Sequence, residues 1–169
     1  IGPMVGAEDR RLAALVILAG PAKAGSEILR DQARWPVLSQ KDLSPAERTA
    51  QLAAADSSIR ADSSAAGAWF QWFYHYDPIP TARRVTQPTL ILHGALDRQV
   101  SSGQADTLAK AIRAGGNRRV TVQVFPGLNH LFLPSPTDGS PSEYTSLTDA
   151  RVPASVLDVL AGWLGRALK

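Results

Sequence analysis

An aspartate and a histidine in this sequence have the residue types needed for paired proton-transfer chemistry. Asp97 lies in the stretch PTLILHGALDRQV (88–100), and His130 lies in VFPGLNHLF (124–132). A carboxylate that accepts a hydrogen bond from histidine Nδ1–H fixes the tautomer of the ring, and it stabilises the imidazolium that forms when the other nitrogen takes a proton. Because the two residues are far apart in the chain, this chemistry depends on the elements that position them.

Each of the two residues follows a segment with the character of a buried strand. Residues 90–92 are an apolar run shortly before a glycine, and residues 120–125 (VTVQVF) are rich in β-branched side chains. A third such segment, LAALVILAG, occupies residues 12–20. Open α/β sheets place ligands and chemistry beyond the carboxyl ends of their strands, so we expect the Asp97 carboxylate and His130 Nδ1 to be hydrogen-bonded at this edge.

Helical segments alternate with these strands. Residues 101–116 (SSGQADTLAKAIRAGG) have apolar side chains at helical spacing, with Ser101 or Ser102 as the N-cap and Gly115 as the left-handed stop. Pro153 can open a last helix. Its predicted apolar face comprises Val156, Leu157, Leu160, Trp163, Leu164 and Leu168. Strands that alternate with helices predict a parallel α/β sheet.

Residues 26–80 interrupt this alternation with a run of consecutive helices. We expect helices at 26–35, 44–56 and 66–76, and in the second of them Ser44 and Glu47 form a capping box. Because this segment lies between two strands, it is placed where a helical cap over the sheet would be inserted.

The stretch WFQWFYHY (69–76) carries aromatic side chains on too many faces for a plain surface helix. One interpretation is packing of the cap helices. The other is that Trp69, Trp72 and Phe73 line a pocket for the acyl or leaving group over the same sheet edge, and one helix can do both. His75 and His93 are expected to have structural roles only.

Together, the segments around Asp97 and His130 and the closing amphipathic helix resemble the C-terminal half of an α/β-hydrolase. The resemblance is to bacterial serine hydrolases related to prolyl-oligopeptidase-type peptidases and dienelactone-hydrolase-like esterases. It covers nearly the whole chain, since residues 1–20 match the end of the helix after the nucleophile and the next strand. It implies the C-terminal part of a parallel α/β-hydrolase sheet with a helical cap insertion at 26–80.

The resemblance also implies hydrolysis of a carboxylic ester or peptide-like acyl bond in a small-molecule substrate. His130 would be the general base and then the general acid, and Asp97 would orient it. In this family the order along the chain is nucleophile, acid, histidine.

The sequence departs from the family pattern at the nucleophile. No G-x-S-x-G occurs, and Ser26 has a glycine only before it and follows the wrong strand. The resemblance places the nucleophile, a serine or alternatively a cysteine or aspartate, upstream of Ile1, together with the oxyanion hole. We therefore expect a truncated chain that needs its N-terminal half and is inactive alone. The alternative is a non-catalytic fragment or a degenerate hydrolase domain that serves binding or assembly.

Composition narrows the classes of protein and of site that fit the sequence. The 169 residues, 44% of them hydrophobic, are typical of one globular domain. Without cysteine there is no disulfide, thiolate metal site or cysteine nucleophile within the chain. Pairs such as Arg83–Arg84 are scattered and lack stacking aromatics, so no nucleic-acid partner is predicted. No run reaches membrane-spanning length, and no metal, phosphate-loop or dinucleotide motif occurs, so we expect no cofactor.

Overall fold

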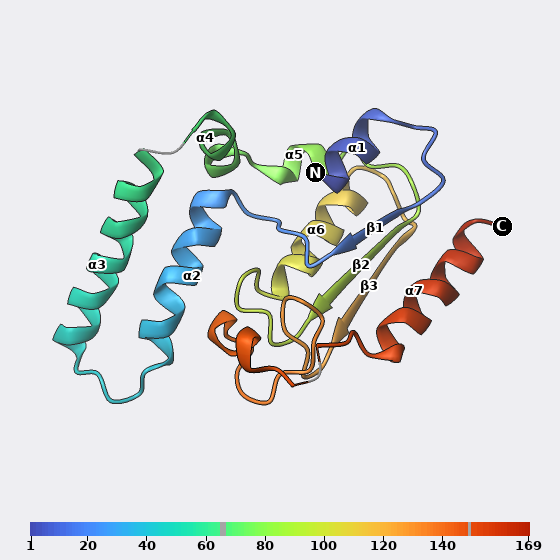
Figure 1. The fold of residues 1–169 in the computed structure, drawn as a ribbon. Helices are drawn as coiled ribbons and strands as arrows, with labels where there is room; N and C mark the ends of the chain where they lie inside the picture. The colour runs from blue at the N-terminus through green and yellow to red at the C-terminus, as the bar shows by residue number, and fades with distance from the viewer. Residues whose placement is uncertain (65–66, 149) are drawn as a thin grey trace. The chain divides into compact units, whose positions relative to one another are not determined.

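The computed structural model describes residues 1–64, 67–148 and 150–169, with the side chains of 60–64 left aside. The described chain divides into two compact units (Figure 1). The first comprises Ile1–Ala22 and Pro78–Lys169, and the second comprises Lys23–Asp77. The first contains the sheet with its helices, and the second contains helices.

The first unit is built on a parallel sheet in the order β1-β2-β3. Its strands are β1 (Leu15–Leu18), β2 (Thr89–Gly94) and β3 (Val120–Phe125). All three lie where the sequence predicts them. Every residue of the central strand β2 is buried, which explains why its sequence is a nearly continuous apolar run rather than an alternating one.

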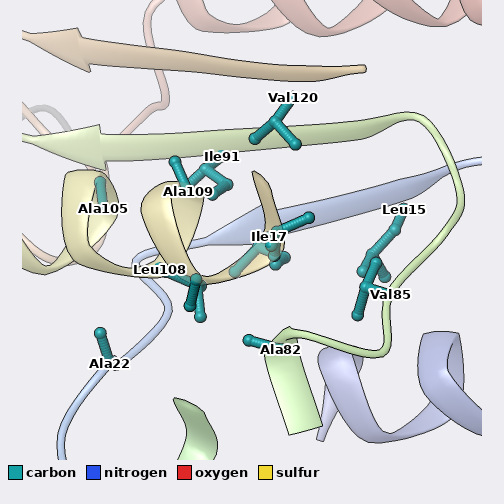
Figure 2. Close-up of a cluster of buried hydrophobic side chains, with 12 residues drawn as sticks. Leu15, Ile17, Ala22, Ala82, Val85, Ile91, Ala105, Leu108, Ala109 and Val120 are labelled. Carbon is teal, nitrogen blue, oxygen red and sulfur yellow. The ribbon is translucent and has the colours of Figure 1, made fainter. Parts of the chain in front are cut away.

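Successive strand residues point to opposite faces of the sheet, and each face has its own hydrophobic cluster. On one face, Ile17 and Ile91 pack with Leu108 of α6 (Gly103–Ala114), as Figure 2 shows. On the other face, Leu90 and Leu92 pack with residues of α7 (Ala154–Ala167). The remaining helices of this unit are α1 (Gly2–Glu8), α5 (Pro78–Ala82) and the 3-10 helix η1 (Pro141–Ser146).

For α6 the predicted N-cap position is confirmed, whereas the predicted left-handed stop at Gly115 is wrong. Ser102 is the N-cap residue, but its backbone is already helical and its side chain makes no capping hydrogen bond. Gly115 has a φ of −78°, and the left-handed residue is Gly116, with a φ of 95°. Gly115 is needed for a different reason, because a Cβ at this position would lie 1.8 Å from the Arg83 carbonyl oxygen.

Helix α7 follows Pro153 as predicted, but two of its expected inward positions are wrong. Leu157 is 53% exposed and Leu168 is 58% exposed. Both lie off the stripe that meets the sheet, which follows the three- and four-residue spacing of a helix face. That stripe consists of Val156, Val159, Leu160, Trp163, Leu164 and Ala167.

The second unit contains α2 (Gly25–Ser39), α3 (Pro45–Ser64) and α4 (Ala68–His75). Helices occur in the three predicted places, although α2 and α3 continue further than the sequence suggests. The predicted capping box is present, because Ser44 N donates to Glu47 Oε2 (3.0 Å) and Glu47 N donates to Ser44 Oγ (3.3 Å). Ala66, where the third helix was expected to begin, lies outside the described residues.

Both ends of the segment Lys23–Asp77 join parts of the first unit that are firmly packed. On the N-terminal side, Ala22 N donates to the buried side chain of Gln104 (2.9 Å). On the C-terminal side, α5 contributes Ala82 to the cluster that also contains Ala22 (Figure 2). The first unit therefore forms this hydrophobic cluster from its own residues. Within the described chain, no helix combines the length and apolar character needed to cross a membrane.

Candidate active site

Asp97 lies in the turn that follows β2, and its side chain is almost completely buried, with the residue 2% exposed. The turn is closed by the carboxylate itself. Asp97 Oδ1 accepts hydrogen bonds from Gln99 N (2.9 Å) and Val100 N (2.8 Å). These two backbone donors fix one oxygen of the carboxylate and leave the other, Oδ2, directed to side chains.

His130 lies in the loop after β3, and Asn129 holds this loop in shape. The Asn129 side chain is fully buried, and its Oδ1 accepts from Leu131 N (3.0 Å) and Leu133 N (3.1 Å). The chain turns sharply here, because Phe132 has a φ of 57°, a conformation that non-glycine residues seldom adopt. The fixed turn presents His130 at the carboxyl edge of the sheet.

The structure brings Asp97 and His130 together, as the sequence predicts. His130 Nδ1 donates to Asp97 Oδ2 over 2.9 Å. The Asp97 side chain has no exposed surface, whereas the His130 side chain is 27% exposed. His130 Nε2 makes no hydrogen bond to any residue that the structure describes. The ring therefore has one nitrogen fixed and the other available as a base.

The surroundings of Asp97 keep its carboxylate ionised. Burial acts to raise its pKa, but hydrogen bonds from His130, His93 and Val100 N outweigh this effect and hold the pKa of Asp97 at about 2. At neutral pH the side chain is therefore an anion. An anion in contact with Nδ1 is the arrangement that stabilises an imidazolium at His130.

His93 belongs to the same cluster, which the sequence analysis missed. It is fully buried near the end of β2, and its Nε2 lies 2.8 Å from Val100 O and 3.1 Å from Asp97 Oδ2. A polar ring inside an otherwise apolar central strand, four residues before Asp97, is the signal that could have identified it.

Glu143 is a second polar residue that the sequence analysis did not identify. It lies in η1, and the residue is 8% exposed. Burial acts to raise the pKa of Glu143, but its polar neighbours, chiefly the Thr137 hydroxyl that donates to Glu143 Oε2 (2.5 Å), outweigh it and lower the pKa. Glu143 thus lies close to the asparagine that shapes the His130 loop, although Asn129 Nδ2 and Glu143 Oε1 have no hydrogen-bond partner among the described residues.

The aromatic residues proposed as a pocket wall lie on α4 in the second unit. Trp69 is 67% exposed and stacks on Phe73, and Trp72 is 42% exposed and stacks on Tyr76. A groove of about 490 Å³ in this unit has a different lining, made of Leu29, Gln32, Ala33, Ser58, Ile59 and Phe70. The pocket role of Trp69, Trp72 and Phe73 therefore stays a prediction.

No hydroxyl group of the described residues is hydrogen-bonded to the imidazole ring of His130. Ser26 lies at the beginning of α2, in the second unit. Among the residues that the structure describes, no three histidine, aspartate or glutamate side chains are grouped as metal ligands would be.

Comparison with known proteins assigns the family. A profile of the prolyl oligopeptidase family matches residues 52–149, which is more than half of the chain. The chain belongs to the prolyl oligopeptidase family. As a member of that family it combines helices with a parallel sheet in a partial α/β-hydrolase fold.

The chain is also similar to two esterases. This prolyl oligopeptidase family chain is 29% identical to esterase EstD of Thermotoga maritima over 163 residues, which cover 94% of the chain and 38% of that protein. It is also similar in structure to an esterase of Pyrococcus furiosus, with a TM-score of 0.56 and 10% identity over 99% of this chain and 49% of the other. The second likeness concerns the fold alone. The chain spans less than half the length of either relative.

Proposed function

We propose that this chain supplies the histidine and the acid of a hydrolase that cleaves carboxylic ester or peptide-like acyl bonds. One observation carries the proposal, namely the 2.9 Å hydrogen bond from His130 Nδ1 to a buried, ionised Asp97. Membership of the prolyl oligopeptidase family and similarity to esterase EstD support the reaction class.

In the proposed reaction, His130 Nε2 takes the proton of the nucleophile as the nucleophile attacks the acyl carbon. The imidazolium then gives this proton to the leaving group, and the acyl group stays on the enzyme. Water attacks the acyl-enzyme in the second half of the reaction, with His130 again as base and then acid. Asp97 stays ionised throughout, and it holds Nδ1–H so that Nε2 keeps its lone pair.

The nucleophile is proposed to be a serine in a segment N-terminal to residue 1, where the family's order of nucleophile, acid and histidine would place it. Two facts support this proposal. The sequence contains no G-x-S-x-G, and the chain corresponds to 38% of the length of esterase EstD. The same upstream segment would supply the backbone N–H groups of the oxyanion hole.

Residues 26–80 are proposed to be a cap insertion that contributes to substrate binding. They lie between β1 and β2, and Lys23–Asp77 form a compact unit of their own. Trp69 and Trp72 expose large apolar surfaces on α4, and such surfaces often mark binding sites. We place the acyl or leaving group against these tryptophans and Phe73.

The test is hydrolysis of p-nitrophenyl acetate and butyrate by the full-length protein, with labelling by a serine-directed fluorophosphonate. His130→Ala and Asp97→Asn should each lower kcat by several orders of magnitude, roughly 10³ or more. His75→Gln, in α4, is the matched control and should be fully active. If the full-length protein neither turns over esters or peptides nor reacts with the probe, the fold serves binding or assembly instead.

A further inference from the structure

We infer that His93 is a positioning residue for the proposed catalytic pair: a neutral imidazole that donates Nε2–H to the Asp97 carboxylate and so holds it against His130. This inference rests on the proposed hydrolase function. It starts from a contact that the proposed reaction does not use, the 3.1 Å separation between His93 Nε2 and Asp97 Oδ2.

The partners of His93 fix its tautomer. Both groups near Nε2, the Val100 carbonyl oxygen at 2.8 Å and the Asp97 carboxylate, can only accept hydrogen bonds. The ring proton must therefore be on Nε2, where it is shared between the two acceptors. Nδ1 is buried and has no hydrogen-bond partner among the described residues. A second proton there would bury an unpaired N–H, which is costly, so the ring is neutral.

His93 completes the set of donors around Asp97. Two donors are backbone N–H groups on Oδ1, from Gln99 and Val100, and two are imidazoles on Oδ2. His93 also fixes the turn, because its Nε2 binds the carbonyl oxygen of Val100 while Val100 N donates to Asp97 Oδ1. One buried ring thus fixes both the carboxylate and the turn that carries it.

Removal of His93 should change the negative charge that His130 experiences. A side chain that served packing alone would have no such effect. Oδ2 shares its negative charge between two N–H donors, so the loss of one leaves more charge directed at His130 Nδ1. The imidazolium form of His130 is then stabilised. The other ionisable groups near this site are Tyr144 and Glu143 in η1, where Gln99 Nε2 donates to the Tyr144 hydroxyl (3.0 Å). Both side chains are kept in the His93 variants.

The experiment compares His93→Leu, which removes the donor, with His93→Gln, whose side-chain amide keeps one. Both are made in the full-length protein, with His75→Gln as the histidine control. We expect His93→Leu to lower kcat/KM for p-nitrophenyl butyrate about tenfold, as for a lost hydrogen bond to a charged group. The midpoint of the acidic limb of kcat/KM should move to higher pH, because this limb reports the ionisation of the base in the free enzyme. His93→Gln should restore most of the rate and the wild-type midpoint.

A second measurement does not depend on activity. In ¹⁵N-histidine-labelled protein, with the His93 signals assigned by their loss in His93→Gln, the ring should be neutral with its proton on Nε2. Asp97→Asn should shift the His93 Nε2 resonance. These results stand even if the protein hydrolyses no ester, so failure of the proposed function and failure of this inference are distinguishable.

Two outcomes would overturn the inference. One is an Nδ1–H tautomer or a charged ring at His93 in the wild-type protein. The other is a loss of rate that is equal in His93→Leu and His93→Gln with an unchanged acidic midpoint, which would indicate packing alone. If His93→Leu does not fold, the spectrum of the wild-type protein and the profile of His93→Gln decide the question.

Discussion

Gly94 and Leu128 approach so closely that a Cβ on Gly94 would lie 2.4 Å from the Leu128 carbonyl oxygen. The same carbonyl accepts a hydrogen bond from Leu96 N (2.9 Å). The turn after β2 and the loop after β3 are thus joined, backbone to backbone. This contact brings Asp97 within hydrogen-bonding distance of His130.

Gly94→Ala should therefore separate the pair. The added methyl group meets backbone atoms that cannot rotate away, so we expect a loss of roughly 1–3 kcal/mol in the free energy of unfolding, together with a large loss of kcat. Thermal or urea unfolding and ester hydrolysis measure the two effects. Gly165→Ala is the matched control, because a Cβ there meets open space in α7. It should be neutral or slightly stabilising. Unchanged kcat in Gly94→Ala would contradict the assigned role.

The ionisation of Asp97 should appear in the acid stability of the protein. Its folded-state pKa of about 2 lies below the ordinary value of 3.8, so the folded state binds this proton less readily than the unfolded state. The resulting stabilisation is fully present above pH 4 and is lost as the pH falls towards 2. It amounts to roughly 2 kcal/mol.

Urea unfolding of the wild-type protein and of Asp97→Asn across this range tests the point. The difference in unfolding free energy between them should shrink as the pH falls from 4 to 2. A difference that is independent of pH would show that Asp97 is not held ionised by its neighbours.

Asn129 and Glu143 should act on the reaction through the shape of the His130 loop. Asn129→Ala removes the acceptor of Leu131 N and Leu133 N, and we expect a loss of about 1–3 kcal/mol for the unpaired buried donors, with lower kcat. Asn129→Asp keeps an oxygen for both amides but places a second charge near Glu143. The loss of unfolding free energy in Asn129→Asp should be smaller in the double variant that also carries Glu143→Gln. A double-mutant cycle of unfolding free energies with no coupling would count against this network.

Residues 1–169 expressed alone should hydrolyse neither p-nitrophenyl acetate nor butyrate, because a base and its orienting acid cannot form an acyl-enzyme without a nucleophile. Among the described residues β1 has an unpaired edge, so association or aggregation of this piece should be visible by light scattering. Co-expression with the proposed N-terminal half should restore turnover. Turnover of the 169-residue chain that His130→Ala abolishes would falsify this prediction. So would fluorophosphonate labelling of a serine within it, and Ser26 would be examined first.

The sequence was informative where local rules govern the structure. The β-branched and apolar runs identify all three strands, and the positions of Asp97 and His130 just beyond two of them predict their contact. The capping box at Ser44 and Glu47 depends only on neighbouring residues, and it forms as predicted.

The features that the sequence analysis missed depend on contacts between distant segments. His93 is read as structural until the turn at Val100 folds back onto its ring. Glu143 lies in a stretch rich in proline, glycine and serine, where nothing local indicates a buried carboxylate. Gly115 is required by the approach of Arg83, and a helix-stop rule cannot detect such a contact.

The insertion between β1 and β2 begins and ends in one hydrophobic cluster, with Ala22 on one side and Ala82 on the other. Among the described residues, that cluster takes no member from the helices of Lys23–Asp77. Substitutions within those helices therefore remove no member of the hydrophobic cluster that packs against the strands preceding Asp97 and His130. On the proposed function, the helical segment is a module in which substrate preference could change over evolution while the proton-transfer pair is kept.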